Sequence, residues 1–285
     1  MITCNLMGGL GNQIFQIFAT LSYAIKTRTQ FKFMNIDTLG GGSTTVRNTF
    51  WNSFFKRLKP FLIDNLPQPI HVVREKGFTY NELPLYEMIG HDTLIFGYFQ
   101  SYKYFNQHFQ IICRIIGITT LKEELLTKIN NYYVNGLDLN NCISIHFRIG
   151  DYKKIQDYHP IMTKDYYCKS LKYIKSKYSE SNFTVLFFCE DSDLDDVMDI
   201  IIYLKKEFSD FIFIRGENSL ADWEQMLFMS CCHHNIIANS SFSWWGAYFN
   251  DWQDKIVCYP SVWFGPYVNH NTKDLCPDEW NKIEA

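Results

Sequence analysis

The sequence lacks several features that would place it in a class at once. Its 285 residues include 27 basic and 30 acidic side chains, a net charge of −3, with no block of like charge. This balance argues against nucleic-acid binding and against a charged tail. No apolar run is long enough to span a bilayer, and the N-terminus lacks the basic start of a signal peptide. We therefore expect a cytoplasmic protein without stable membrane insertion.

The cysteines form no recognisable set of metal ligands or bridges. There are nine, an odd number, with no C-x-x-C pair. We expect free, mostly buried thiols in a reducing compartment. Aromatic residues make up 17% of the chain, which fits an aromatic core and would also suit stacking against a carbohydrate.

Strand-like and helix-like segments alternate along the chain. We expect strands at residues 2–6, 31–34, 93–98, 142–147, 184–189, 211–214, 235–238 and 255–259. We expect helices at residues 13–26, 102–116, 121–134, 164–177, 192–208, 220–231 and 243–249, with a further helical piece at 51–58 in the otherwise irregular stretch 37–92. This alternation predicts an α/β protein with two doubly wound parallel-sheet lobes, residues 1–135 and 136–285, divided near 135–141. Such a protein binds its ligand in the cleft between its lobes.

The most informative segment is residues 142–152, CISIHFRIGDY. An apolar strand here delivers His146, Arg148 and Asp151 at its carboxyl end, the edge where open α/β sheets bind ligands. His146 and Arg148 are two residues apart, so both point to one face of an extended chain. Arg148 offers a permanent cationic fork for a diphosphate, His146 could donate to it, and Asp151 could orient Arg148 or take a proton. The alternative is a buried structural Arg–Asp pair.

A glycine-rich turn follows the first strand, at residues 8–13 (GGLGNQ). Such a turn at a helix N-terminus presents backbone N–H groups and the helix dipole to an anion. A dinucleotide fingerprint would need a third glycine three positions after Gly11, and there is no Walker Lys-Ser/Thr pair. Gly9, Gly11 and the amides of Asn12 and Gln13 could contact a phosphate or a sugar. The alternative is an ordinary βα turn.

Hydroxyl groups gather at residues 239–246 (NSSFSWWG), after another short strand. Three serines at a helix N-terminus can cap the helix or bind an anion. Asn239, Ser240 and Ser241 are therefore candidate ligands, with plain capping as the alternative. The two tryptophans are expected to pack in the core.

Acidic residues follow the strand expected at 184–189. Glu190 and Asp191 could accept hydrogen bonds from a ribose or a guanine edge. Asp191 and Asp193 also form a D-x-D pattern, which in some sugar-nucleotide enzymes holds a metal ion but is common by chance. Asp193 also suits the first turn of the next helix, where negative charge is favourable, and Ser192 starts a pattern resembling a capping box.

Four segments together resemble one family, the α-1,2-fucosyltransferases of glycosyltransferase family 11. The segments are residues 8–16 (GGLGNQIFQ), 146–152 (HFRIGDY), 159–160 (HP) and 239–247 (NSSFSWWGA). The resemblance implies a GT-B-like fold of two lobes, GDP-β-L-fucose as donor, a galactose-terminated glycan as acceptor, and inversion to an α-1,2 linkage. It implies no metal and no cofactor.

The resemblance also assigns roles and exposes departures. It implies that Gly11, Asn12 and Arg148 meet the donor diphosphate, with the N-terminal lobe on the acceptor side and the C-terminal lobe binding GDP-fucose. Family members often carry a second arginine where this chain has Ile149. Neighbouring side chains on a strand point in opposite directions, so we expect Arg148 to keep the main role. The chain also reads Cys-Glu-Asp at 189–191 where the family often has Ser-Asp-Asp.

The expected reaction is a single in-line displacement at the anomeric carbon. Arg148, the turn backbone at residues 9–12 and the serine hydroxyls would stabilise the departing diphosphate. Asp151 and Glu190 are the candidate general bases, with His146 third. Alternatives are a GDP-fucosyltransferase of another linkage such as α-1,6, a metal-dependent transferase that uses the D-x-D pattern, and a non-catalytic sugar-nucleotide binder.

Overall fold

A computed structural model describes residues 1–41, 45–85, 91–133, 136–178 and 182–285. The chain forms two compact units. Unit 1 comprises Met1–Leu121 and His270–Pro277, and unit 2 comprises Lys122–Asn269 and Asp278–Ala285.

The division between the units lies within helix α4 (Ile118–Tyr132), before the expected boundary at 135–141, of which residue 135 is outside the described residues. Most of α4 is tied to unit 2 by ion pairs. Lys122 Nζ lies 2.6 Å from Asp251 Oδ2, and Lys128 pairs with Glu224.

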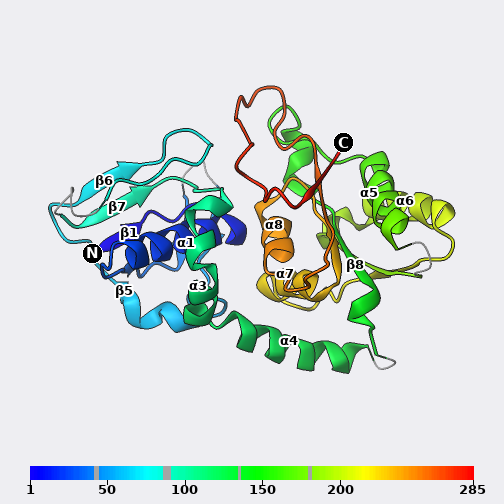
Figure 1. Cartoon of the computed structure of the whole chain (residues 1–285), viewed down its shortest axis with the longest axis horizontal. Helices are drawn as coiled ribbons and strands as arrows, with labels where there is room; N and C mark the ends of the chain where they lie inside the picture. Colours follow the sequence, from blue (N-terminus) through cyan, green and yellow to red (C-terminus); the bar gives the residue numbers. More distant parts are fainter. Residues whose placement is uncertain (42–44, 86–90, 134–135, 179–181) are drawn as a thin grey trace. The chain divides into compact units, whose positions relative to one another are not determined.

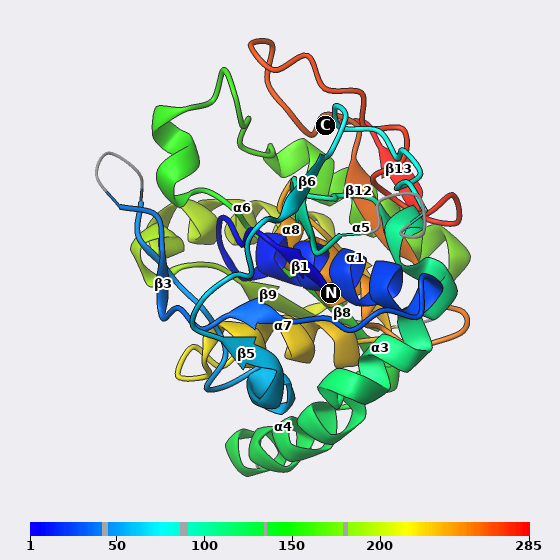
Figure 2. The same cartoon turned by 90° about the vertical axis from the view of Figure 1, so that its left-hand side faces the viewer.

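Unit 1 is built on a three-stranded parallel sheet. The strand order is β1 (Ile2–Cys4), β7 (Thr93–Phe96), β6 (His71–Arg74). Helix α1 (Leu10–Lys26) packs against β1, as Figures 1 and 2 both show, and all but three of its residues are buried. Burial on nearly every side explains why α1 carries apolar residues around its whole circumference.

The stretch expected to be irregular contains short strands. β3 (Thr38–Leu39) pairs with β4 (Arg47–Asn48), and β5 (Leu62–Ile63) pairs with β2 (Phe33–Met34). The helical piece expected at 51–58 is instead a run of turns leading into the 3-10 helix η1 (Lys56–Phe61).

The single helix expected at 102–116 is also wrong in part. It is broken into the 3-10 turns η2 (Tyr102–Tyr104) and η3 (Asn106–His108) before helix α3 (Phe109–Ile116). The break falls at Phe105, whose φ of −137° is not helical.

Unit 2 contains a six-stranded sheet in which every neighbouring pair is parallel. The order is β10 (Ile212–Arg215), β9 (Thr184–Phe188), β8 (Cys142–His146), β11 (His234–Ile236), β12 (Val257–Pro260), β13 (Asn281–Ile283). The expected α/β alternation is confirmed here, and β13 is an addition. In Figure 1, α5 (Lys164–Lys177) and α6 (Leu194–Glu207) lie on one side of β8, and α7 (Asp222–Cys231) and α8 (Ser241–Tyr248) on the other.

The interior of unit 2 follows from this layering. Apolar side chains on alternate positions of β8 and β9, among them Ile143, Ile145 and Val185, pack with those of α5 and α6. Trp244 and Trp245 of α8 are fully buried, which confirms that they are core residues. All nine cysteines are free and most are buried, as expected.

The capping box expected at Ser192 is wrong. Helix α6 begins at Leu194, behind a 3-10 turn η6 (Asp191–Asp193), and Asp193 makes no side-chain cap bond. The Asp193 carboxylate instead accepts a hydrogen bond from the Gly150 backbone N–H at 2.6 Å. Within the described residues, no helix combines the length and apolarity needed to cross a membrane.

Candidate active site at the sheet switch point

The strand order of unit 2 marks a position for a ligand. From β8 the chain proceeds outward through β9 to β10, and it then returns to β11 on the other side of β8. Ligands of open α/β sheets bind beyond the carboxyl ends of the strands where the order reverses in this way. The segments that follow β8 and β11 are the HFRIGDY and NSSFSWWG motifs, so the topology brings both to one place.

Arg148 lies just beyond the end of β8, between two carboxylates. Its Nη2 is 2.6 Å from Asp151 Oδ1, and its Nη1 donates to Glu190 Oε1. Burial works to lower the pKa of Arg148, but the fields of Asp151 and Glu190 outweigh it and the pKa is raised. Arg148 is therefore a fixed cation. Its side chain is 21% exposed, against 51% for Asp151 and 57% for Glu190, so the carboxylates are on the solvent side.

The Tyr152 ring packs against the guanidinium group of Arg148. The guanidinium carbon is 5.1 Å from the centroid of the Tyr152 ring, and the His159 ring stacks on that ring at 4.9 Å and 22°. The Tyr152 hydroxyl donates to the Asn239 carbonyl oxygen at 3.2 Å. Tyr152 thus links the β8 motif to the β11 motif, a role that the sequence analysis missed although the residue closes the HFRIGDY segment.

His146 ends β8 and is buried. Its Nδ1 has no hydrogen-bond partner, and the Phe242 ring lies 5.4 Å away. Burial, and then the charge of Arg148, lower its pKa to about 3. His146 is therefore uncharged near pH 7.

The residues that follow Arg148 explain the departure from the usual double arginine. Ile149 is 4% exposed and belongs to the core between the sheet and α5, so it points away from the site as expected. Gly150 has a φ of +24°, and a Cβ at this position would come within 3.2 Å of Glu190 Oε2. The left-handed backbone of the turn therefore favours glycine at this position.

The acidic residues that follow β9 have different hydrogen-bond partners. Asp191 pairs with Arg215, and Asn218 Nδ2 donates to the same carboxylate at 3.2 Å. These two hydrogen bonds, the Arg215 bond first, hold the pKa of Asp191 below its usual value. Asp193 bonds to the Gly150 N–H instead. The D-x-D carboxylates thus serve separate contacts, and the described residues contain no group of three or more His, Cys, Asp or Glu placed to hold a metal ion.

The β11 motif supplies a clamp and a helix N-terminus. The buried Asn239 amide nitrogen donates to the carbonyls of Pro160 (3.0 Å) and Trp263 (3.1 Å), so it ties together two loops. Ser240 caps α8 by accepting from Phe242 N at 3.3 Å, as the capping interpretation predicts. Its hydroxyl hydrogen, and the hydroxyl of the partly buried Ser241, are groups that can donate to an anion.

The glycine turn of unit 1 opens α1 as expected. Gly8 has a φ of +75°, and a Cβ there would lie 2.4 Å from Asn12 Nδ2, while open space surrounds Gly9. Asn12 Oδ1 accepts from Gln100 Nε2 at 2.7 Å. Gln13 is fully buried and donates to the carbonyls of Gly8 and Asn48, so its amide is a structural tie and not a ligand contact.

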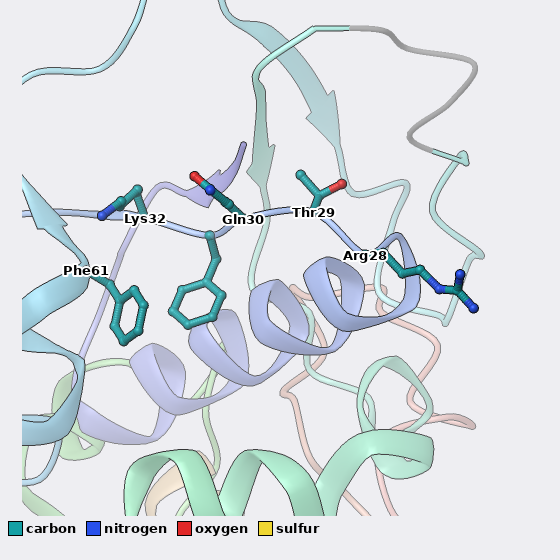
Figure 3. A pocket seen from close by; sticks show the side chains of 6 residues that line it. Arg28, Thr29, Gln30, Lys32 and Phe61 are labelled. Carbon is teal, nitrogen blue, oxygen red and sulfur yellow. The ribbon is translucent and has the colours of Figure 1, made fainter.

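A hollow of about 440 Å³ on unit 1 is a different feature (Figure 3). It is lined by Arg28, Thr29, Gln30, Phe31, Lys32 and Phe61. In Figure 3, Arg28 points away from Lys32 and Phe61, so the two cations do not converge. None of these six residues belongs to a predicted site.

Comparisons with known proteins agree with the resemblance. The chain is 28% identical to an alpha-1,2-colitosyltransferase of Escherichia coli, over 100% of this chain and 99% of that protein. It is 26% identical to the O-antigen biosynthesis glycosyltransferase WbnK of the same species, over 98% and 99%. In fold it is similar to the E. coli ADP-heptose LPS heptosyltransferase II, with a TM-score of 0.51, 10% identity, and coverage of 99% and 89%.

The fold class is therefore confirmed as α/β with parallel sheets of the GT-B-like kind. The profile of Glycosyl transferase family 11 matches residues 76–284, more than half of the chain and including every unit 2 residue of the site above. The chain belongs to glycosyl transferase family 11.

Proposed function

We propose that this protein transfers L-fucose from GDP-β-L-fucose to the 2-hydroxyl of a terminal galactose, with inversion and without a metal. The observation that carries the proposal is Arg148, a partly buried cation at the switch point of the unit 2 sheet. A nucleoside-diphosphate leaving group needs a fixed positive charge at the place where its own charge develops. The family membership supplies the reaction class, glycosyl transfer.

The charge around Arg148 indicates how a diphosphate would bind. One cation and two carboxylates give a local charge of −1, which repels an anion as it stands. Asp151 and Glu190 are each about half exposed, so either can swing into water while Arg148 stays on Tyr152. The hydroxyls of Ser240 and Ser241 and the N-terminus of α8 add neutral donors, which attract an anion without a compensating carboxylate. The turn at Gly9, Gly11 and Asn12 stays a predicted diphosphate contact.

The reaction follows as one in-line displacement. The acceptor hydroxyl oxygen forms a bond to the anomeric carbon while the bond from that carbon to the diphosphate oxygen breaks. The hydroxyl proton passes to a carboxylate, for which Glu190 and Asp151 are the candidates. A positioned base adds about 10²–10⁴-fold to such a rate. Whichever carboxylate the diphosphate displaces from Arg148 is freed to take the proton.

The identity of the donor sugar has one specific rival. The full-length relative named above transfers colitose, which is L-fucose without its 3-hydroxyl, so a GDP-linked colitose is the second candidate donor. A site that hydrogen-bonds the 3-hydroxyl would strongly prefer fucose, because its polar groups would be unpaired against colitose. Rates with the two donors at equal concentration distinguish the candidates.

The decisive experiment is GDP release from GDP-fucose, with and without lactose, in the presence of EDTA. Release that depends on lactose, with an α-1,2 product by NMR, is the expected result. An α-1,6 product would assign another linkage. Loss of activity in EDTA would restore the metal-dependent alternative with Asp191 and Asp193. GDP-fucose binding without transfer to any galactoside would favour the sugar-nucleotide binder.

A further inference from the structure

Two exposed tyrosines lie on loops at the carboxyl edge of the unit 2 sheet. Tyr158 follows the β8 motif and is 49% exposed, and Tyr267 follows β12 and is 69% exposed. Their rings meet edge to face, with centroids 5.7 Å apart at 90°. Tyrosine combines an apolar ring face with a polar hydroxyl, which is why it is enriched at binding surfaces.

The two loops are held rigidly against one another. Gly265 N donates to Tyr158 O at 2.8 Å, and Tyr267 N donates to Asp157 O at 3.0 Å. A Cβ on Gly265 would come within 2.3 Å of that same Asp157 oxygen, so only glycine permits this approach. The Asn239 amide also joins the same two loops, because it donates hydrogen bonds to the carbonyl oxygens of Pro160 and Trp263.

Residues close in sequence to this pair make ring contacts that lead to the candidate active site. His159, the residue after Tyr158, stacks on Tyr152, and Tyr152 lies under Arg148. His159 also contacts the Phe264 ring at 5.5 Å, on the loop that carries Tyr267. The loops that carry the exposed rings are therefore anchored, through His159, to Tyr152, the ring that packs on Arg148.

We infer that Tyr158 and Tyr267 form a saccharide platform that holds the acceptor glycan beside the reacting centre. A pyranose ring has an apolar C–H face that packs on an aromatic ring, while its hydroxyls remain at the edge near water and the phenol oxygens. Tyrosine gives this contact at a low cost in conformational entropy, and the paired loops lower that cost further. A neutral sugar fits the two rings, which offer apolar faces and hydroxyls and no charge. The inference rests on the proposed function, since it names where that reaction's acceptor binds. It departs from the expectation that the N-terminal lobe is the acceptor side, because both tyrosines belong to unit 2.

The test uses the full chain, with GDP-fucose as donor and lactose as the acceptor probe. The double variant Tyr158→Ala/Tyr267→Ala should raise the lactose KM about tenfold or more, because each lost stacking contact is worth several-fold in affinity. The KM for GDP-fucose should change less than about twofold, since the rings do not touch Arg148. Tyr158→Phe/Tyr267→Phe keeps the stacking and should stay near wild type. Tyr132→Ala, at an equally exposed tyrosine on α4, is the matched control.

Direct binding separates this inference from the proposed function. Saturation-transfer NMR with lactose and GDP should show transfer to the sugar in wild type and in the Phe variant, and a loss in the Ala variant. If wild type transfers fucose and the Ala variant keeps its lactose KM, the platform is wrong and the proposed function stands. If lactose binds through the two rings but no transfer occurs, the platform stands and the proposed function fails. Wild type that does not bind lactose at all overturns the platform.

Discussion

Two arginines in unit 2 look alike and lie in different places. Arg148 follows β8 and is paired with Asp151 and Glu190; Arg215 ends β10 and is paired with Asp191. Their side chains are 21% and 23% exposed. β8 lies at the switch point of the sheet, whereas β10 is its edge strand. Residue type and exposure are nearly the same for the two arginines, so it is their position in the sheet that supports the proposal that Arg148, and not Arg215, meets the leaving group.

The largest expected effect comes from replacing each of the two arginines with alanine in separate variants. Arg148→Ala should lower kcat/KM by about 10²–10³-fold and weaken GDP binding, because a preorganised charge at the leaving group is lost. Arg215→Ala should change kcat/KM by only a few-fold. Steady-state kinetics and GDP calorimetry measure both effects. Equal losses in the two variants would show that sheet position does not decide the role.

The support beneath Arg148 gives the next largest effect. Tyr152→Leu removes the ring under the guanidinium and the bond to Asn239, and should weaken GDP binding about tenfold. Tyr152→Phe loses only the hydroxyl and should weaken it about threefold. Thermal unfolding serves as the control for general damage. A Leu variant with wild-type GDP affinity would mean that Arg148 does not depend on this ring.

The pH dependence of stability tests the burial of His146 next to Arg148. His146 has a pKa lowered to about 3, so the unfolded chain takes up a proton below about pH 6.5 while the folded chain does not. Folding stability should therefore fall as the pH drops below 6.5. His146→Gln removes this contribution, so the decrease in the free energy of unfolding between pH 7 and pH 5 should be smaller by about 1–2 kcal/mol. Urea unfolding at the two pH values measures this difference. If wild type and variant lose the same unfolding free energy between pH 7 and pH 5, a group other than His146 takes up the proton on unfolding.

The smallest expected effect concerns the carboxylates that pair with the two arginines. Glu190→Gln removes a negative charge that competes with the diphosphate for Arg148, so GDP should bind about threefold more tightly. The corresponding change at the carboxylate paired with Arg215, Asp191→Asn, should not tighten GDP binding. Calorimetry gives both affinities. The kcat of Glu190→Gln, compared with that of Asp151→Asn, identifies the base, because only the variant that lacks it loses turnover without losing GDP affinity.

Long periodic elements and their end motifs could be predicted from the sequence. Helix α5 has the expected bounds, and β8 and β9 end within one residue of expectation. Short strands such as β6 and β13 were missed, since four residues or fewer carry no reliable periodicity. The start of α6 was wrong because a tertiary contact, Asp193 with Gly150, replaced the local cap.

Part of the candidate site could also be predicted from the sequence. Arg148, Asp151 and Glu190 lie together because parallel strands bring their carboxyl ends to one edge, which sequence order alone suggests. Tyr152 under Arg148 and the Asn239 clamp depend on side-chain directions in irregular loops. Those directions are set by packing between segments far apart in the chain, and a linear pattern does not contain them.

The path of the C-terminal segment limits how this protein can be divided. Residues His270–Pro277 belong to unit 1, and the chain then returns to unit 2 to form β13. In unit 1, Asp274 accepts hydrogen bonds from Tyr80 N (3.1 Å) and, at its carbonyl, from Ser101 Oγ (2.6 Å). Neither unit is therefore one continuous stretch of sequence. Exchange of unit 2 between relatives by a single gene junction would leave unit 1 with another protein's segment at Asp274, so recombination that preserves folding needs three junctions.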